Sequence, residues 1–226
     1  MNSTPWIFMM MGRPAAGKTT IARSLSGALS LHYISESEIK LSIKESFSRA
    51  DSLDEELRDR SYMEAIRVLR ESVLSGNSVL LDATFHRRKR RKWVYAVAQE
   101  AKCACVILYL HCGDLAETRR RIDRRKTRPY VAETLGNAFE IYAHVDRDFD
   151  EFDLDEVQGL TAAAFYRIDS CEQLVEQRWA FGLHDPWGTA KEESVFAAIS
   201  HSLSDPSPER RHGNDSSQAL RAESAE

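Results

Sequence analysis

The residues that decide the expected fold are Gly12-Arg-Pro-Ala-Ala-Gly17-Lys18-Thr19. They fit the pattern GxxxxGK[ST] and stand between an apolar run, Trp6–Met10, and a helical pattern that starts near Lys18. The two glycines allow backbone conformations that are closed to other residues, so successive N–H groups can converge on phosphate oxygens. The helix that follows adds the positive end of its dipole. We therefore interpret Gly12–Thr19 as a phosphate-binding loop, called the P-loop below.

Such a loop predicts a nucleotide site for ATP with Mg²⁺. Lys18 is expected to reach the β- and γ-phosphates, and the hydroxyl of Thr19 is expected to bind Mg²⁺. The residues expected to contact the nucleotide here are Gly12, Arg13, Pro14, Ala15, Ala16, Gly17, Lys18, Thr19 and Thr20.

Short apolar runs alternate with helical periodicity along the chain. The runs typical of strands are Trp6–Met10, His32–Ile34, Val79–Leu81, Ala104–Leu110 and Ala163–Ile168. Strands that alternate with helices predict an α/β fold, here a three-layer P-loop NTPase fold with a five-stranded, mostly parallel sheet and a helical lid. We expect the P-loop strand at the centre, with the strand that ends at Asp82 beside it. The expected domain is 1–182, followed by a possible docking helix at 183–203 and a disordered tail at 204–226.

The composition is that of an ordinary soluble domain. Of 226 residues, 42% are hydrophobic and 29% charged, and the formal net charge of -4 predicts no general attraction to nucleic acid or anionic membranes. No stretch approaches the roughly 18 apolar residues of a membrane span, and the first residues do not resemble a signal peptide, so we expect a cytoplasmic protein. Cys103 and Cys105 share one face of a strand and are interpreted as core thiols. Nothing in the four cysteines indicates zinc or an oxidising compartment.

A second feature, an acidic residue at the end of a strand, supports the interpretation of Gly12–Thr19 as a phosphate-binding loop. The apolar run Val79–Leu81 ends on Asp82, at the edge of the sheet where open α/β folds bind ligands. Asp82 is therefore a candidate for holding Mg²⁺ with Thr19 or for orienting an acceptor hydroxyl. The alternative is a helix-capping or surface acid.

These motifs together resemble a known family. The GxxxxGKT loop, the polar end of the second strand, Asp82-Ala-Thr-Phe85 and an arginine-rich late helix look like the AAA_33-type P-loop kinases. That group is similar to the kinase domain of polynucleotide kinases, to gluconate kinases and to zeta-toxin-like kinases. The resemblance covers about Trp6 to Leu174. It implies transfer of the γ-phosphate of ATP to a hydroxyl of a small-molecule or polynucleotide acceptor.

One departure from the family pattern concerns the general base. Family members often carry Ser-Asp-x-x-Arg after the second strand, whereas this chain has Ser37 in place of the Asp and Lys40 in place of the Arg. Glu36 is adjacent, and its longer side chain could supply the missing carboxylate. The alternative for this stretch is a helix start with acids in the first turn.

Two basic runs follow. Thr118–Arg128 holds seven cationic residues, and in the resembling kinases a helical lid, here about 119–150, brings arginines to the transferring phosphate. Arg121 and Arg125 share a helical face and are the predicted catalytic arginines, with Arg128 next as a nucleotide contact. Some of these charges must instead form a solvated face.

The other run, Arg87–Lys92, has six consecutive basic residues. It could bind an anionic acceptor, including nucleic acid, or it could pair with the acidic stretch Asp146–Glu156. After the last predicted strand, Asp169 stands where the resemblance implies a contact to adenine or ribose, although a helix cap is equally compatible.

Three functions stay open at this stage. The favoured one is a kinase for a small molecule or polynucleotide, the second a zeta-toxin-like nucleotide-sugar kinase, and the third a nucleotide-dependent switch or regulatory ATPase. The arginine-rich lid favours transfer, because a lid keeps water from the γ-phosphate.

Overall fold

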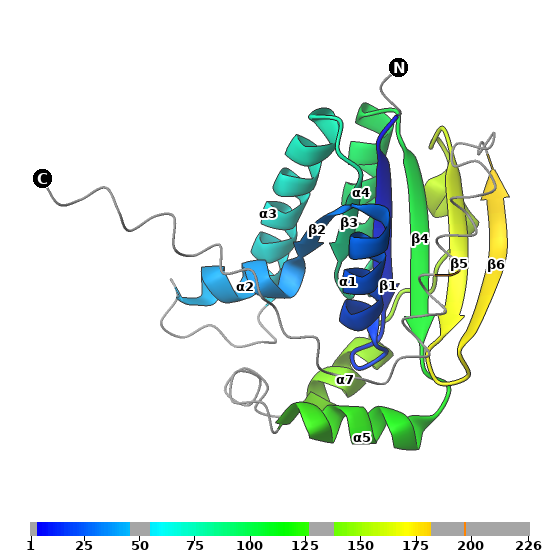
Figure 1. Cartoon of the computed structure of the whole chain (residues 1–226). Helices are drawn as coiled ribbons and strands as arrows, with labels where there is room; N and C mark the ends of the chain where they lie inside the picture. Colours follow the sequence, from blue (N-terminus) through cyan, green and yellow to red (C-terminus); the bar gives the residue numbers. More distant parts are fainter. Residues whose placement is uncertain (1–3, 46–54, 127–137, 182–196, 198–226) are drawn as a thin grey trace, which may run out of the picture.

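A six-stranded sheet forms the centre of the molecule, with strand order β2-β3-β1-β4-β5-β6 (Figure 1). The computed structural model describes residues 4–45, 55–126 and 138–181 and residue 197. The strands are β1 (Trp6–Gly12), β2 (His32–Ser35), β3 (Val79–Asp82), β4 (Ala104–His111), β5 (Ala163–Asp169) and β6 (Leu174–Phe181). β1 to β5 are parallel, and β6 is antiparallel to β5.

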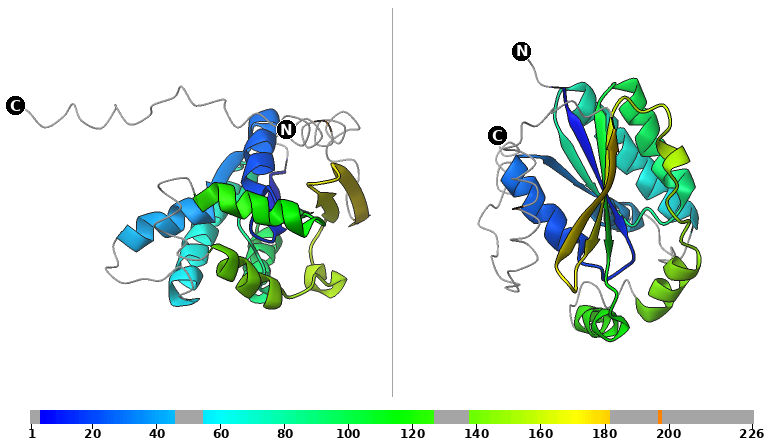
Figure 2. Two further views of the ribbon diagram at one scale, coloured as in Figure 1. Left: turned by 90° about the horizontal axis from the view of Figure 1, so that it is seen from below. Right: turned by 90° about the vertical axis from the view of Figure 1, so that its right-hand side faces the viewer.

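Helices cover both faces of the sheet, as the edge-on view in Figure 2 shows. They are α1 (Lys18–Leu29), α2 (Glu36–Glu45), α3 (Glu55–Leu74), α4 (Arg88–Glu100), α5 (Leu115–Lys126) and α7 (Ala138–Arg147), with a 3-10 turn, η1, at Leu154–Val157. β1 is buried along its whole length. Ile7 and Met9 pack towards α3 and α4, while Phe8 and Met10 pack towards α1. Its continuous apolar run is therefore explained by burial on two sides.

The predicted α/β architecture is confirmed, and the strand count is corrected. The P-loop strand lies inside the sheet and β3 pairs with it, as expected. The expectation of five strands missed β6, which adds an antiparallel edge. Its sequence includes the ion-paired residues Glu176 and Arg178, which interrupt the apolar pattern because an edge strand does not need two buried faces. The predicted docking helix and tail, 183–203 and 204–226, lie outside the described residues apart from residue 197.

The predicted lid corresponds to α5 and α7, which pack together at the P-loop end of the sheet (Figure 1). A small apolar cluster joins Ala15 of the P-loop to Ile122 of α5, with Phe139 and Tyr142 of α7 against it. α5 and α7 therefore lie directly on the loop. Residues 127–137 between them are outside the described part.

The basic run Arg87–Lys92 is largely committed to ion pairs. Arg87 binds Asp148 at 2.8 Å, and Lys89 binds Asp59 at 2.7 Å. Arg91 is fully buried and forms a two-pronged pair with the equally buried Glu156, at 2.8 and 2.6 Å. The alternative of pairing with the acidic stretch is thus confirmed for Arg87 and Arg91.

We expect Arg91→Ala to lower the free energy of unfolding by about 3–5 kcal/mol, because it leaves the carboxylate of Glu156 buried without its partner. Urea denaturation followed by circular dichroism measures this loss. The matched control is Lys92→Ala, the exposed next residue of the helix, which should change stability by less than about 0.5 kcal/mol. Equal denaturation midpoints for the two variants would contradict the assignment of Arg91 to the core.

Candidate active site

The P-loop has the backbone conformation that its glycines predicted. Gly12 has φ 139° and Gly17 has φ 89°, both in the region that favours glycine. A side chain at Gly12 would begin 2.0 Å from the carbonyl oxygen of Leu110 on β4, so no larger residue fits there. The Gly12 amide also donates to the carbonyl of Thr84, at 3.1 Å, which ties the loop to the segment after β3.

Lys18 begins α1 and reaches back across the loop. Its ammonium donates to the carbonyl oxygens of Gly12, at 2.9 Å, and Arg13, at 2.8 Å. The side chain thus lies over the loop's own backbone, and no side chain caps the helix start at Gly17. A flexible point charge held this way can exchange carbonyl oxygens for phosphate oxygens.

Glu36 is the first residue of α2 and is 9% exposed. Its Oε1 accepts a hydrogen bond of 2.5 Å from the hydroxyl of Ser61 on α3. Ser37 faces a different partner, the hydroxyl of Ser35 at 3.1 Å. The carboxylate at this position of the chain is therefore oriented by α3.

Asp82 ends β3 and is buried, 4% exposed. It lies in register with Ser35 of β2 and Met10 of β1. The hydroxyl of Tyr33 donates to its Oδ2 at 2.9 Å. Burial, and then the charge of Asp82, raise the pKa of Tyr33, so the tyrosine stays a donor and holds the carboxylate in place. Thr19 and Asp82 remain the predicted magnesium ligands, since their hydroxyl and carboxylate oxygens are the donors that Mg²⁺ prefers.

Arg121 of α5 is brought to the P-loop. Its guanidinium donates to the carbonyl of Ala15 at 3.3 Å, and to the hydroxyl and carbonyl of Ser170 at 2.8 and 3.2 Å. Glu117 accepts from it at 2.9 Å. A hydrogen bond from Arg120, followed by opposing burial and then the bond from Arg121, brings the pKa of Glu117 to about 2, so this carboxylate stays ionised and orients Arg121.

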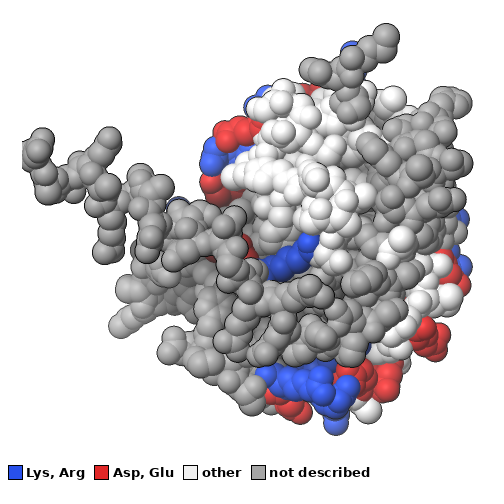
Figure 3. Space-filling view, viewed as in Figure 1, with Lys and Arg blue, Asp and Glu red and all other residues white. Residues whose placement is uncertain are grey.

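Three further arginines were predicted to contact the nucleotide or the transferring phosphate: Arg13, Arg125 and Arg128. Arg13 directs its side chain away from the loop, to Asp146 and to the hydroxyl of Tyr109 at 2.6 Å. Arg125 lies in α5, but its side chain is outside the described part of the chain, as is the whole of Arg128. Figure 3 shows basic side chains along the lower edge of the molecule, where α5 lies, with acidic ones among them.

Asp169 uses its carboxylate to close the turn after β5. Oδ1 accepts from the amides of Cys171 and Glu172, at 2.8 and 3.1 Å. Burial alone would raise the pKa of Asp169, but these amides and the neighbouring His111 outweigh it and lower the pKa. The carboxylate thus closes a hairpin turn between β5 and β6, and since no helix starts there the helix-cap alternative is wrong. A contact from this turn to adenine or ribose stays a prediction.

A disulfide joins Cys112, after β4, to Cys171, after β5. This bond differs from the sequence-based expectation, which paired neither cysteine and indicated no oxidising compartment. The two residues are 59 positions apart, and nothing local marks them as partners. Cys171 follows Ser170, so the bond fixes the turn that holds Arg121. Cys103 and Cys105 are free and buried, as predicted.

A cavity of about 100 Å³ lies against the P-loop. Pro14 forms its P-loop side, and Glu36 and Lys40 of α2 form a second side. Ile141 and Val145 of α7 supply an apolar wall from the lid. The predicted base Glu36 therefore lines a partly open cavity that borders the phosphate-binding loop.

The remaining cavity residues were not singled out from the sequence. They are Arg58 and Tyr62 of α3, Thr84 and His86 after β3, and Arg90 of α4. A signal existed for two of them, because Arg58 and Tyr62 are spaced i,i+4 on one helical face. His86 directly follows the Asp82–Phe85 motif, which could have indicated it. Arg90 was hidden among five other basic residues.

Comparison with known proteins identifies the family. The family model AAA_33, described as an AAA domain, matches residues 7–139. The chain belongs to the AAA_33 family. A search of curated proteins gave no match. No helix in the described ranges is long and apolar enough to cross a membrane.

Solved structures share the fold of this AAA_33 protein at low sequence identity. A protein of Chloroflexus aurantiacus, provisionally named a kinase, is 17% identical with a TM-score of 0.59, over 76% of this chain and 92% of the other. Kti12 of Chaetomium thermophilum, solved with ADP-AlF3, is 18% identical with a TM-score of 0.56, over 88% and 100%. A fungal RNA kinase is 13% identical with a TM-score of 0.52, over 91% and 99%. The fold is thus that of P-loop kinase-like proteins.

Proposed function

We propose that this protein is a kinase that transfers the γ-phosphate of ATP to a hydroxyl of a second substrate bound in the cavity beside the P-loop. The observation that carries the proposal is the position of Glu36, a buried carboxylate that lines a partly open cavity bordered by the P-loop residue Pro14. A phosphate-binding loop by itself is common to all P-loop proteins and does not identify the reaction. A neighbouring cavity lined by a carboxylate favours phosphate transfer to an alcohol, because the carboxylate can accept the proton of the alcohol.

We assign the following roles to the site residues. The P-loop amides and Lys18 would hold the β- and γ-phosphates, and Thr19 and Asp82 would hold Mg²⁺, which neutralises phosphate charge when bound. The acceptor oxygen would form a bond to the γ-phosphorus while the bond from that phosphorus to the β,γ-bridging oxygen breaks, releasing ADP. The proton of the acceptor hydroxyl would pass to Glu36, whose orientation is fixed by Ser61.

The lid supports transfer over hydrolysis. α7 places apolar side chains, Ile141 and Val145, in the cavity wall. Such a wall would limit the access of water to the reacting phosphate. The acceptor class remains open between small molecules and polynucleotides, and 5′-hydroxyl oligonucleotides belong among the candidates because an RNA kinase shares the fold.

The proposal is tested by ADP release in the presence and absence of acceptors. We expect slow ADP formation from ATP·Mg²⁺ alone and faster formation with one class from a panel of sugars, nucleosides, 5′-hydroxyl oligonucleotides, antibiotics and nucleotide sugars. Stimulation by nucleotide sugars alone would select the zeta-toxin-like alternative. A slow rate that no acceptor changes would instead favour a nucleotide-dependent switch.

Arg121→Ala is expected to reduce turnover by about 10²-fold while changing ATP affinity little, because its donors would meet charge that develops during transfer. Turnover and the dissociation constant for ATP are measured separately. Arg120→Ala is the matched control, since Arg120 also binds Glu117 but is exposed and does not contact the P-loop. Arg121 would be an ordinary phosphate clamp if affinity fell and turnover did not.

A further inference from the structure

Two buried side chains that line the cavity each have polar atoms without a partner. His86 is 2% exposed and Arg90 is 1% exposed. Among the described residues, neither ring nitrogen of His86 has a hydrogen-bond partner, and nor does Nη1 of Arg90. Buried polar atoms nearly always have such partners. Orphaned donors that line a cavity therefore indicate a ligand that supplies the missing acceptors.

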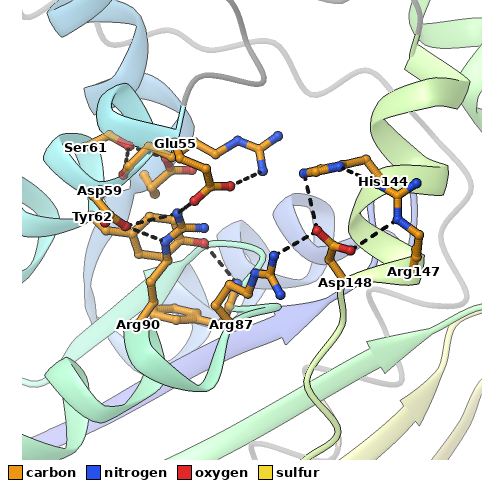
Figure 4. A network of polar contacts seen from close by, with 12 residues as sticks. Glu55, Asp59, Ser61, Tyr62, Arg87, Arg90, His144, Arg147 and Asp148 are labelled. Atoms are coloured by element: carbon orange, nitrogen blue, oxygen red, sulfur yellow. Dashed lines mark hydrogen bonds and ion pairs between the residues drawn. The ribbon is translucent and has the colours of Figure 1, made fainter.

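The guanidinium of Arg90 is held rigidly by its other atoms. Its Nε and Nη2 donate to Asp59 at 3.1 and 3.0 Å, and Nη2 also donates to Glu55 at 2.5 Å. The same group stacks on the ring of Tyr62, 4.8 Å from its centroid. Figure 4 shows this arrangement between α3 and α4. Glu55 and Asp59 are partly exposed and do not line the cavity, so they fix Arg90 from the outside.

The lining of the cavity is mainly cationic. Arg58, Arg90 and Lys40 line it, against the single carboxylate of Glu36. Burial, and then the charges of Arg90, Arg58, Arg87 and His144, lower the pKa of His86 to about 3. The imidazole is therefore neutral, with one N–H to donate. Such surroundings favour an anion over a cation or a neutral group.

The other members of the basic run do not extend this site into a surface groove. In Figure 4, the side chain of Arg87 forms an ion pair with Asp148, the residue after α7. Lys89 pairs with Asp59, and Arg91 pairs with Glu156 in the core. Of the run, Arg90 is the residue that lines the cavity. This pattern fits a small anion better than the long backbone of a nucleic acid.

We infer that the acceptor is a small alcohol with one anionic group, a carboxylate or a phosphate monoester, bound by Nη1 of Arg90 and the N–H of His86, with its hydroxyl towards Glu36. This inference rests on the proposed function, since it names the acceptor class of the same site. A cavity of about 100 Å³ is smaller than the roughly 150 Å³ space that accommodates benzene. It therefore suits an anionic group and its adjoining carbons.

The inference is tested by anion binding with the P-loop already filled. The protein is saturated with a non-hydrolysable ATP analogue and Mg²⁺, then titrated in a calorimeter with inorganic phosphate, acetate or acetamide. Acetamide is the neutral match for acetate. We expect at least one of the two anions to bind and acetamide to give no measurable heat. The stronger of the two anions distinguishes a phosphate monoester from a carboxylate as the natural group.

Arg90→Gln should weaken binding of that anion by at least about tenfold, the loss expected for one charge-assisted hydrogen bond. Lys89→Gln is the matched control, because Lys89 also pairs with Asp59 but is exposed and does not line the cavity. It should leave the affinity unchanged. His86→Leu provides a second variant that keeps Arg90 and its ion pairs. It too should weaken binding of the anion. Absence of anion binding, or equal affinity in wild type, Arg90→Gln and His86→Leu, would overturn the inference.

Different results would contradict the kinase activity and the anionic acceptor. If the nucleotide analogue binds and a neutral alcohol or an oligonucleotide accepts phosphate best, the kinase proposal stands and the anionic acceptor is wrong. If the analogue does not bind, the kinase proposal fails. The anion titration is still informative in that case. If the affinity for the anion depends on Arg90, the anion is bound in the cavity and not by the P-loop.

Discussion

Lys18→Ala is expected to reduce phosphoryl transfer by about 10³-fold or more, since it removes a positive charge from the transferring phosphate. The protein should remain folded, because the Lys18 ammonium contacts loop carbonyls and not the core. Transfer is measured with γ-labelled ATP, and folding by the thermal midpoint and circular dichroism spectrum.

Arg67→Ala controls for general loss of a positive charge. Arg67 is an exposed residue of α3 that pairs with Glu64 and Glu71. Its removal should leave transfer within about twofold of wild type, since surface pairs contribute little. Wild-type transfer by Lys18→Ala would refute the interpretation of Gly12–Thr19 as the phosphate site of a kinase.

Glu36→Gln is expected to slow transfer by about 10²–10⁴-fold, the usual contribution of a general base. A neutral amide of the same shape leaves the P-loop untouched, so ATP affinity should barely change. The matched control is Glu38→Gln, two residues along the same helix, where the carboxylate is exposed and bound to Arg23. The measurement compares single-turnover rates and ATP dissociation constants for the three proteins.

Asp82 is the rival base. If Glu36→Gln transferred at the full rate while Asp82→Asn was inactive but still bound ATP·Mg²⁺, the base would belong to β3. Glu36 would then serve only as an acidic residue in the first turn of α2. The contacts favour Glu36, because it lines the cavity and Asp82 is held by Tyr33. Ser37→Asp, which restores the family pattern, should be tolerated if the acceptor approaches from α2.

The central architecture was predictable because local and global signals agree there. The P-loop requires glycine at Gly12 and Gly17 for conformational reasons that are visible in the sequence. The apolar run of β1 reflects burial on both faces, and parallel neighbours follow from the alternation of strands and helices. Asp82 at the end of β3 was expected at the sheet edge on the same grounds.

The unpredicted features depend on contacts between distant residues. The antiparallel edge strand β6 carries charges and lacks a continuous apolar pattern. The bond between Cys112 and Cys171 depends on β4 and β5 being neighbours. The basic run could not be sorted from its sequence, because only tertiary packing shows that Arg91 is in the core and Arg90 is in the cavity.

The most direct test of the central claim is where the label goes in a single turnover. Protein loaded with γ-labelled ATP and Mg²⁺ is mixed with the acceptor panel, including small hydroxy acids and sugar phosphates, then quenched and separated by chromatography. The account predicts label in an organic phosphate, with inorganic phosphate as the minor product, and loss of the organic product in Lys18→Ala. Label found only in inorganic phosphate with every acceptor would contradict phosphoryl transfer to an alcohol and leave hydrolysis as the activity of this site.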